Sequence, residues 1–145
     1  MVGKHALPKS ILFVCQMNMV RSPMAEGLMK KLYPGVITVK SCGLSQGDVD
    51  DWVQTVMSEV GVDLSRHEPK TLHDLSGQVF DIVIAFTNEA AQASEALFED
   101  SDTQILHWPL PMPSEGSLDV RAVMNNYRAM RGVIKTRLSN YFSNP

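Results

Sequence analysis

A short apolar run that stops at a cysteine and leads directly into a helix start is the feature that most restricts the fold of this chain. Residues 11–14 read Ile-Leu-Phe-Val, a run typical of a strand covered on both faces. Ser22 and Pro23 then favour the start of a helix, because serine is a preferred N-cap and proline at the first helical position gives up only an N–H without a partner. A buried strand, a turn and a helix in this order are typical of α/β proteins with a parallel sheet.

The alternation of strand and helix continues along the 145 residues without repeats, low-complexity tracts or a linker. Short runs rich in β-branched or aromatic residues predict strands at Ile11–Cys15, Val36–Cys42, Phe80–Phe86 and Thr103–His107. Helices are predicted at Pro23–Leu32, Asp48–Val60, Asn88–Leu97 and Ser117–Tyr141. We therefore expect one domain at residues 10–145, a mostly parallel sheet with helices on both faces, preceded by a loose extension at residues 1–9.

The turn after Cys15 predicts an anion site. Backbone N–H groups can converge there, with the positive end of the following helix dipole behind them. The planar fork of Arg21 can hold two oxygens of a phosphate at once. The same donors would stabilise a thiolate, so Cys15 is the expected nucleophile, although a buried Cys15 and a solvated Arg21 would also fit the bare spacing. The expected phosphate-binding residues are Gln16, Met17, Asn18, Met19, Val20, Arg21 and Ser22.

Composition limits the class of protein further. A chain of 145 residues that is 44% hydrophobic suits one domain with its own core, and its net charge is −3. No apolar run approaches the length of a membrane span and no leader precedes the first strand, so we expect a cytoplasmic protein without a membrane partner. The absence of a basic block argues against nucleic acid as a partner. The four histidines show no metal-ligand spacing, and no metal or organic cofactor is implied.

Several motifs resemble those of the low-molecular-weight protein tyrosine phosphatases and of their relatives, the thioredoxin-coupled arsenate reductases. The resemblance covers nearly the whole chain after residue 9 and is most specific around the cysteine. The segments that carry it are Val14-Cys15, Asn18, residues 21–26, Ser41-Cys42-Gly43, residues 61–67, residues 80–84 and His107-Trp108-Pro109.

The resemblance implies a fold and a mechanism. The fold would be a flavodoxin-like three-layer sandwich with a four-stranded parallel sheet in the order 2-1-3-4. Cys15 would attack phosphorus to give a cysteinyl-phosphate that water hydrolyses, while Arg21 binds the equatorial oxygens. Ser22 would hydrogen-bond the sulfur. Asn18 would hold the loop in shape, because asparagine tolerates the left-handed conformation.

Two positions depart from the family pattern. Met112 stands where the family carries the aspartate that acts as general acid, and methionine cannot donate a proton. Glu115 and Asp119 are possible substitutes, although an acidic residue there also suits the start of the last helix. Met17 replaces a glycine of the loop: it would strain the loop if the position needs a positive φ, and would simply point outward if it does not.

Cysteine usage bears on the arsenate reductase alternative. The resemblance places Thr87 and Ser94 where the reductases carry their redox cysteines, and hydroxyl groups cannot form a disulfide. Cys42 remains as a possible redox partner if its strand neighbours that of Cys15; the alternative is a small buried residue.

Together these observations predict a phosphate-monoester hydrolase of the tyrosine phosphatase type. Its expected partners are a phosphorylated protein or a small aryl phosphate, together with inorganic phosphate or sulfate-type anions. The first alternative is a binding relative that holds phosphate or a phosphoprotein with little turnover. The second is an arsenate reductase-like enzyme.

Overall fold

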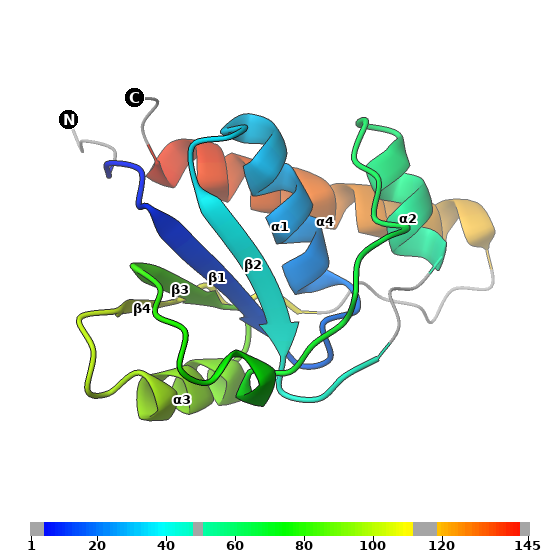
Figure 1. Cartoon of the computed structure of the whole chain (residues 1–145). Helices are drawn as coiled ribbons and strands as arrows, with labels where there is room; N and C mark the ends of the chain where they lie inside the picture. Colours follow the sequence, from blue (N-terminus) through cyan, green and yellow to red (C-terminus); the bar gives the residue numbers. More distant parts are fainter. Residues whose placement is uncertain (1–4, 48–50, 112–118, 143–145) are drawn as a thin grey trace.

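A computed structural model describes residues 5–47, 51–111 and 119–142, and its centre is a parallel sheet in the order β2-β1-β3-β4 (Figure 1). The four strands are β1 (Ser10–Cys15), β2 (Thr38–Gly43), β3 (Ile82–Ala85) and β4 (Gln104–His107). The helices of the described residues are α1 (Arg21–Leu32), α2 (Asp51–Ser58), α3 (Asn88–Leu97) and α4 (Val120–Tyr141), with a short 3-10 helix at His73–Leu75. The predicted α/β class, parallel sheet and strand order are confirmed.

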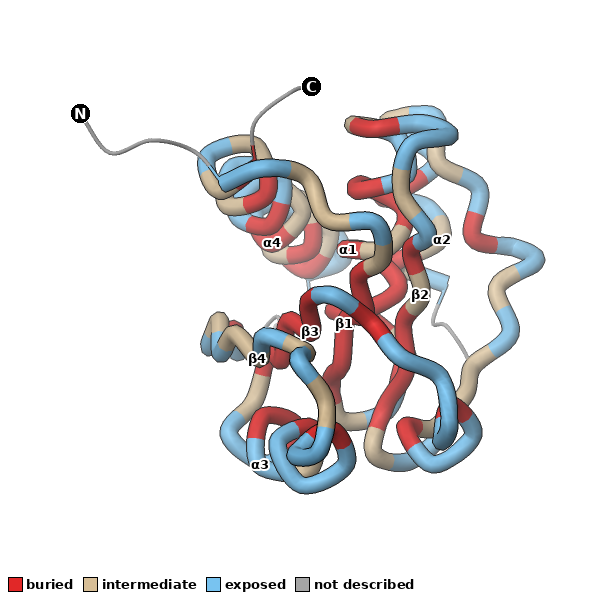
Figure 2. Tube along the Cα trace, turned by 60° about the vertical axis from the view of Figure 1, so that its left-hand side comes forward, coloured by how far each residue is buried: buried red, intermediate tan, exposed pale blue. Residues whose placement is uncertain are grey.

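The helices form two outer layers on either side of the sheet. Helices α1, α2 and α4 cover one face, while α3 and the 3-10 helix lie on the other (Figure 1). Strand β1 is the central strand and is buried along nearly its whole length, whereas β4 at the edge is only partly covered (Figure 2). Cys15 is therefore delivered from the best-covered strand to the carboxyl end of the sheet, which is where ligands of open α/β sheets bind.

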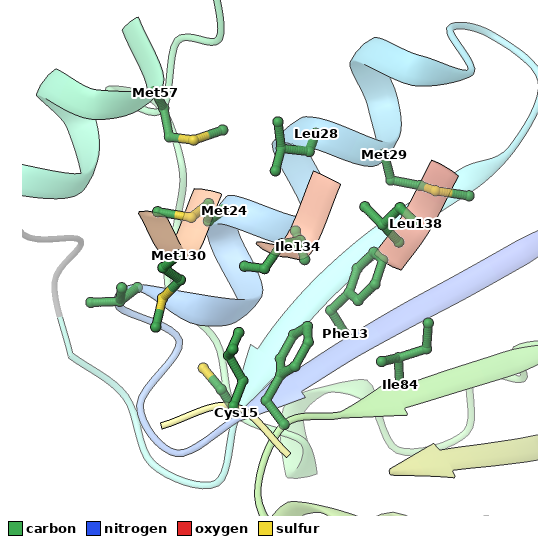
Figure 3. Close-up of a cluster of buried hydrophobic side chains, with 14 of the residues drawn as sticks. Phe13, Cys15, Met24, Leu28, Met29, Met57, Ile84, Met130, Ile134 and Leu138 are labelled. Atoms are coloured by element: carbon green, nitrogen blue, oxygen red, sulfur yellow. The ribbon is translucent and has the colours of Figure 1, made fainter. Parts of the chain in front are cut away.

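The side chains of β1 divide between the two layers with the period of two that a strand imposes. Ile11 and Phe13 pack with α1, α2 and α4, and Leu12 and Val14 pack with α3 and the 3-10 helix. Figure 3 shows Phe13 beneath Ile134 and Leu138 of α4. The apolar run thus builds two cores at once, which explains why no polar residue interrupts it.

The structure differs from the prediction at several places: α1 begins at Arg21 instead of Pro23, α2 ends at Ser58 instead of Val60, and β3 runs over Ile82–Ala85 instead of Phe80–Phe86. Strand β2 begins at Thr38 rather than Val36, which is exposed. The 3-10 helix at His73–Leu75 was not predicted. In the described part of the N-terminal extension, the His5 N–H donates to the Tyr141 carbonyl at 2.8 Å and the two rings stack. Residues 48–50 and 117–118, at predicted helix starts, lie outside the described residues.

The helices of the described residues include none that is both long enough and apolar enough to cross a membrane.

Replacing Ile134 by alanine should test the core between α4 and the sheet. Ile134 is 1% exposed, so Ile134→Ala should lower the free energy of unfolding by about 2–5 kcal/mol through lost burial and the cavity left behind. The neighbouring Val133 on the same helix is 42% exposed, and Val133→Ala should change the free energy by less than about 0.5 kcal/mol. Urea unfolding of both variants measures the difference; equal losses would contradict the described orientation of α4.

Candidate active site

The loop between β1 and α1 leaves its backbone N–H groups without hydrogen-bond partners among the described residues. Its carbonyl groups face the segment after β2: the carbonyl oxygens of residues 15, 16 and 17 accept hydrogen bonds from the N–H groups of Leu44 (3.1 Å), Ser45 (2.9 Å) and Gly47 (3.0 Å). Because the N–H of a peptide points away from its carbonyl, the N–H groups of residues 16–18 face the opposite side. None of the N–H groups of residues 16–22 donates to another described group. They are a set of neighbouring free donors, which is what an anion site needs.

Gly43 allows the loop to lie directly on the end of β2. It is the register partner of Cys15, and a Cβ at this position would lie 2.5 Å from the backbone nitrogen of Asn18 and 2.5 Å from the backbone carbonyl oxygen of Ser45. Any side chain would push the loop away from the strand, so the site depends on this glycine.

Asn18 fixes the shape of the loop. Its φ of 56° makes it the one non-glycine residue with a positive φ among those described, which confirms the predicted left-handed conformation. Its Nδ2 donates to Ser22 Oγ at 2.9 Å and to Ser41 Oγ at 3.1 Å. Its Oδ1 accepts from the Lys70 N–H at 3.0 Å and lies 3.0 Å from His67 Nε2. All of the amide's polar atoms are therefore used, and they tie the loop to three other segments.

The ring of His67 is placed as a donor to this network. Because Asn18 Oδ1 can only accept, the hydrogen on the ring must lie on Nε2. Burial lowers the pKa of His67 below its ordinary value, against the opposing effect of Glu26, and so favours the neutral ring.

Ser22 is not the helix cap that the sequence predicted. Helix α1 begins at Arg21, two residues before the predicted start at Pro23, and the residue at its N-cap, Val20, makes no side-chain hydrogen bond. The Ser22 side chain is fully buried and turns inward instead, where its Oγ lies 2.8 Å from Cys15 Sγ and donates to the Cys42 carbonyl at 3.2 Å. The cap prediction failed because the sulfur, the carbonyl and the Asn18 amide all compete for this hydroxyl.

Arg21 is buried beside the loop, and its Nε is unpaired among the described residues. Its side chain is held by a 2.9 Å hydrogen bond from Nη1 to the carbonyl of Leu110, in the segment after β4, and the residue is 6% exposed. Its Nε has no hydrogen-bond partner in the described part of the chain. Burial lowers the pKa of Arg21 from its ordinary value, and Cys15 opposes this effect; the guanidinium still stays charged at neutral pH.

Met17 does not have a positive φ, so the alternative in which its side chain points outward without straining the loop holds. It is 41% exposed. Both Met17 and Met19 lie over Gly47, where an added Cβ would come within 3.2 Å of Met17 Cε and 2.6 Å of Met19 Sδ. Gln16 faces another direction and accepts a 2.9 Å hydrogen bond from the Thr87 hydroxyl at the start of α3. Methionine is therefore accommodated in the loop without backbone strain.

The two thiols lie on opposite faces of the sheet. Cys42 pairs with Val14 in the register, so its side chain points into the core beneath α3, whereas Cys15 faces α1 (Figure 3). Both cysteines are free, and burial raises the pKa of Cys42 to about 12. The prediction that neighbouring strands would bring the two sulfurs within disulfide range is wrong, because adjacent register positions point to opposite faces.

The candidate proton donors are placed unequally. Met112 and Glu115 lie outside the described residues. Asp119 is exposed and caps α4, where its Oδ1 accepts from the Arg121 N–H at 2.9 Å. This is the structural role that the sequence offered as the alternative for Asp119.

Two contacts of the site were missed from the sequence, although His67 lies in residues 61–67, one of the segments that carry the family resemblance. His67 was classed with the other scattered histidines, and its contact with Asn18 joins residues 49 positions apart. The Leu110 carbonyl that holds Arg21 is a backbone group, which any residue could supply.

The geometry defines a doubly wound α/β protein with a thiol-centred oxyanion loop at the carboxyl end of its central strand. The sequence model of the low molecular weight phosphotyrosine protein phosphatases matches residues 10–144, and the chain belongs to this family.

The chain is 33% identical over 137 residues to a glutaredoxin arsenate reductase from Synechocystis sp., covering 91% of this chain and 95% of that protein. It is 43% identical over 68 residues to the low molecular weight protein-tyrosine-phosphatase Ptp of Acinetobacter johnsonii, covering 45% of this chain and 47% of that protein. A solved arsenate reductase in a phosphate-binding state is 31% identical, covers 91% of this chain and 95% of its own, and gives a TM-score of 0.72. The family is enzymatic and includes phosphatases and arsenate reductases.

Mild peroxide should oxidise the two cysteines separately. Because the sheet separates the side chains, we expect oxidation products of Cys15 alone and no Cys15–Cys42 crosslink in peptide mass spectrometry under non-reducing conditions. Unfolding the protein before oxidation is the control that makes both thiols reachable. A crosslinked peptide pair from the folded protein would contradict the described register.

Asn18 variants should separate its two roles. Asn18→Ala should lower the free energy of unfolding by about 2–5 kcal/mol, since it leaves buried polar groups unpaired and forces a left-handed alanine. Asn18→Gly should recover about 1–2 kcal/mol of that loss, because glycine adopts the same φ without strain. Urea unfolding measures both; an Asn18→Gly variant as stable as wild type would show that the hydrogen bonds contribute nothing.

Proposed function

We propose that this protein hydrolyses phosphate monoesters, with a preference for aryl phosphates such as phosphotyrosine, through a cysteinyl-phosphate on Cys15. The observation that carries the proposal is the position of Cys15. It ends β1 beside the free N–H groups of residues 16–22, and its Sγ lies 2.8 Å from Ser22 Oγ. A phosphate held by those donors and by Arg21 would place its phosphorus next to the sulfur.

The first half of the reaction transfers the phosphoryl group to the protein. Cys15, as a thiolate, attacks phosphorus; the bond from phosphorus to the ester oxygen breaks, and its electron pair leaves with the alcohol or phenol. The free N–H groups and Arg21 Nε would receive the charge that spreads over the phosphoryl oxygens. In the second half, water attacks phosphorus, the S–P bond breaks, and inorganic phosphate leaves while sulfur regains its electron pair.

Ser22 would act through its single hydroxyl proton. That proton can serve either the Cys42 carbonyl, 3.2 Å away, or the sulfur, 2.8 Å away. A neutral thiol can donate to Ser22 Oγ, but a thiolate can only accept. Rotation of the hydroxyl toward the sulfur would stabilise the thiolate and ease its departure from phosphorus.

The preference for aryl phosphates follows from the proton donors. Asp119 is engaged as the cap of α4, and Met112 has no proton to give. Loss of general acid catalysis typically costs about 10²–10⁴ in rate, and the cost is least when the leaving group is already a weak base. Phenolic leaving groups meet that condition better than alkyl alcohols do. If the loss is nearly complete, the same site would serve as a phosphate- or phosphoprotein-binding module.

Arsenate reduction is the second candidate, because a close relative and a similar solved structure are arsenate reductases. An internal disulfide relay would need further thiols near Cys15. Thr87 instead caps α3 with its hydroxyl, Ser94 is fully buried, and Cys42 lies across the sheet. The chain could reduce arsenate only if an external thiol supplied both electrons. Either activity requires a reduced Cys15, which fits a reducing compartment such as the cytoplasm.

Hydrolysis of p-nitrophenyl phosphate by matched cysteine variants should test the proposal. Cys15→Ser should abolish turnover and retain binding of inorganic phosphate, because only the nucleophile is lost. Cys42→Ala should retain turnover, because that side chain lies on the other face of the sheet. Phosphate binding by wild type without turnover would favour the binding module. Arsenate-dependent oxidation of glutathione, without phosphatase activity, would favour the reductase.

Restoring a carboxylic acid at residue 112 should raise the phosphatase rate. Met112→Asp should increase kcat by up to about 10²-fold on phenyl phosphate and by much less on p-nitrophenyl phosphate, whose leaving group needs little protonation. Met112→Asn is the matched control, since it has the same shape but no acidic proton. Equal gains on the two substrates would contradict a general-acid role, and no gain would indicate that Glu115 or another group already donates.

A further inference from the structure

A hollow lies between α1 and α4, and its lining contains no residue of the loop after Cys15. It has a volume of about 460 Å³, within the range of about 300–1,000 Å³ that is typical of small-ligand sites. Its walls come from the second half of α1, the middle of α4 and Val60 just beyond α2. We call it the α1–α4 hollow.

The floor of the α1–α4 hollow is apolar, and one of its lining residues, Gly132, has no side chain. Leu28, Leu32 and Val60 line it, and all three belong to or pack against the larger core. Gly132 of α4 contributes no side chain, and no atom lies within 4 Å of the place where its Cβ would be. A glycine inside a helix is unfavourable by about 1 kcal/mol relative to alanine, so the space that it opens comes at a cost in stability.

The rim of the α1–α4 hollow is cationic. Lys31, Arg128, Arg131 and Lys135 surround it. Glu59 forms ion pairs with both arginines, at 2.7 Å and 2.9 Å, and Lys31 donates to the Val60 carbonyl at 2.5 Å. The rim therefore has four cations and one carboxylate.

The rim of the hollow is cationic although the protein as a whole is acidic. Helix α4 carries Arg121, Arg128, Arg131, Lys135 and Arg137 and no acidic residue, whereas the whole chain has a net charge of −3. Solubility alone does not require five cations without an acid on one helix, because mixed charges serve it equally well. An apolar floor with a cationic rim is complementary to a ligand that is apolar at one end and anionic at the other.

We propose that the α1–α4 hollow binds a small anionic amphiphile, a free carboxylate with a medium-length alkyl chain. The alkyl chain would cover Leu28, Leu32 and Val60, filling the space that Gly132 leaves. The carboxylate would lie at the rim, next to Lys135 and Lys31. This proposal does not depend on catalysis at Cys15, since the two sites share no residue.

Calorimetric titration of the full chain with sodium octanoate, below its micelle concentration, tests the proposal. We expect one saturable site for octanoate and binding at least about tenfold weaker for butanoate, because fewer methylene groups are buried. Repeating the titration at saturating inorganic phosphate should leave octanoate binding unchanged. Competition by phosphate would place the carboxylate at the Arg21 loop and overturn the proposal.

Variants locate the site. Gly132→Leu fills the hollow without a charge change, and Lys135→Glu reverses one charge of the rim. Each substitution should weaken octanoate binding by at least about fivefold. Lys40→Glu makes the same charge change on the opposite face of the sheet and should leave binding within about twofold of wild type. The circular dichroism of each variant checks the fold.

Two outcomes would overturn the proposal. One is the absence of saturable octanoate binding to wild type, or binding that Gly132→Leu and Lys135→Glu leave unaltered. The other is sedimentation with anionic phosphatidylglycerol vesicles that depends on Lys135, with no binding of free octanoate. That result would assign the cationic rim to a lipid surface instead of a free ligand.

Discussion

The amide of Asn18 is the interaction on which the rest of the site depends. A left-handed residue lies at this position of the loop, whose carbonyl oxygens accept hydrogen bonds from the segment after β2 and whose N–H groups stay unpaired beside Cys15. Four hydrogen bonds from one side chain hold that conformation against its backbone strain. Without them the N–H groups would have no common direction, and a thiol at the end of β1 would be only a buried polar atom. The reactivity expected of Cys15 is therefore a property of the loop more than of the residue.

Burial gives the site its strength and also its selectivity between the two thiols. Arg21 and Ser22 are nearly or completely removed from solvent, so their hydrogen bonds act at a low local dielectric. Cys42 is equally buried but faces an apolar layer, where burial raises its pKa to about 12. Neighbouring strands thus provide one thiol among donors and one without them. A difference of one residue in register separates a candidate nucleophile from an inert core residue.

Much of the fold could be predicted because it rests on local patterns. The Ile-Leu-Phe-Val run, the turn and Pro23 identify a central strand and the helix after it, and the strand order followed from the family resemblance. The errors have physical causes. Ser22 was assigned to capping, because a sequence does not show which of several partners wins a hydroxyl. Cys42 was placed near Cys15, because strand adjacency was considered without side-chain parity. The His67 and Leu110 contacts join distant segments and leave no periodic signal.

The stacking of His5 on Tyr141 has a practical consequence for handling the molecule. It holds the beginning and the end of the described chain together near the amino end of β1, while Cys15 lies at the carboxyl end of that strand (Figure 1). A linker joined to His5 or Phe142 would therefore start at the end of the sheet opposite the thiol. Immobilised or fused forms should keep the loop of Cys15 open, and a peptide bridge between His5 and Phe142 would give a cyclised or permuted chain with the same sheet.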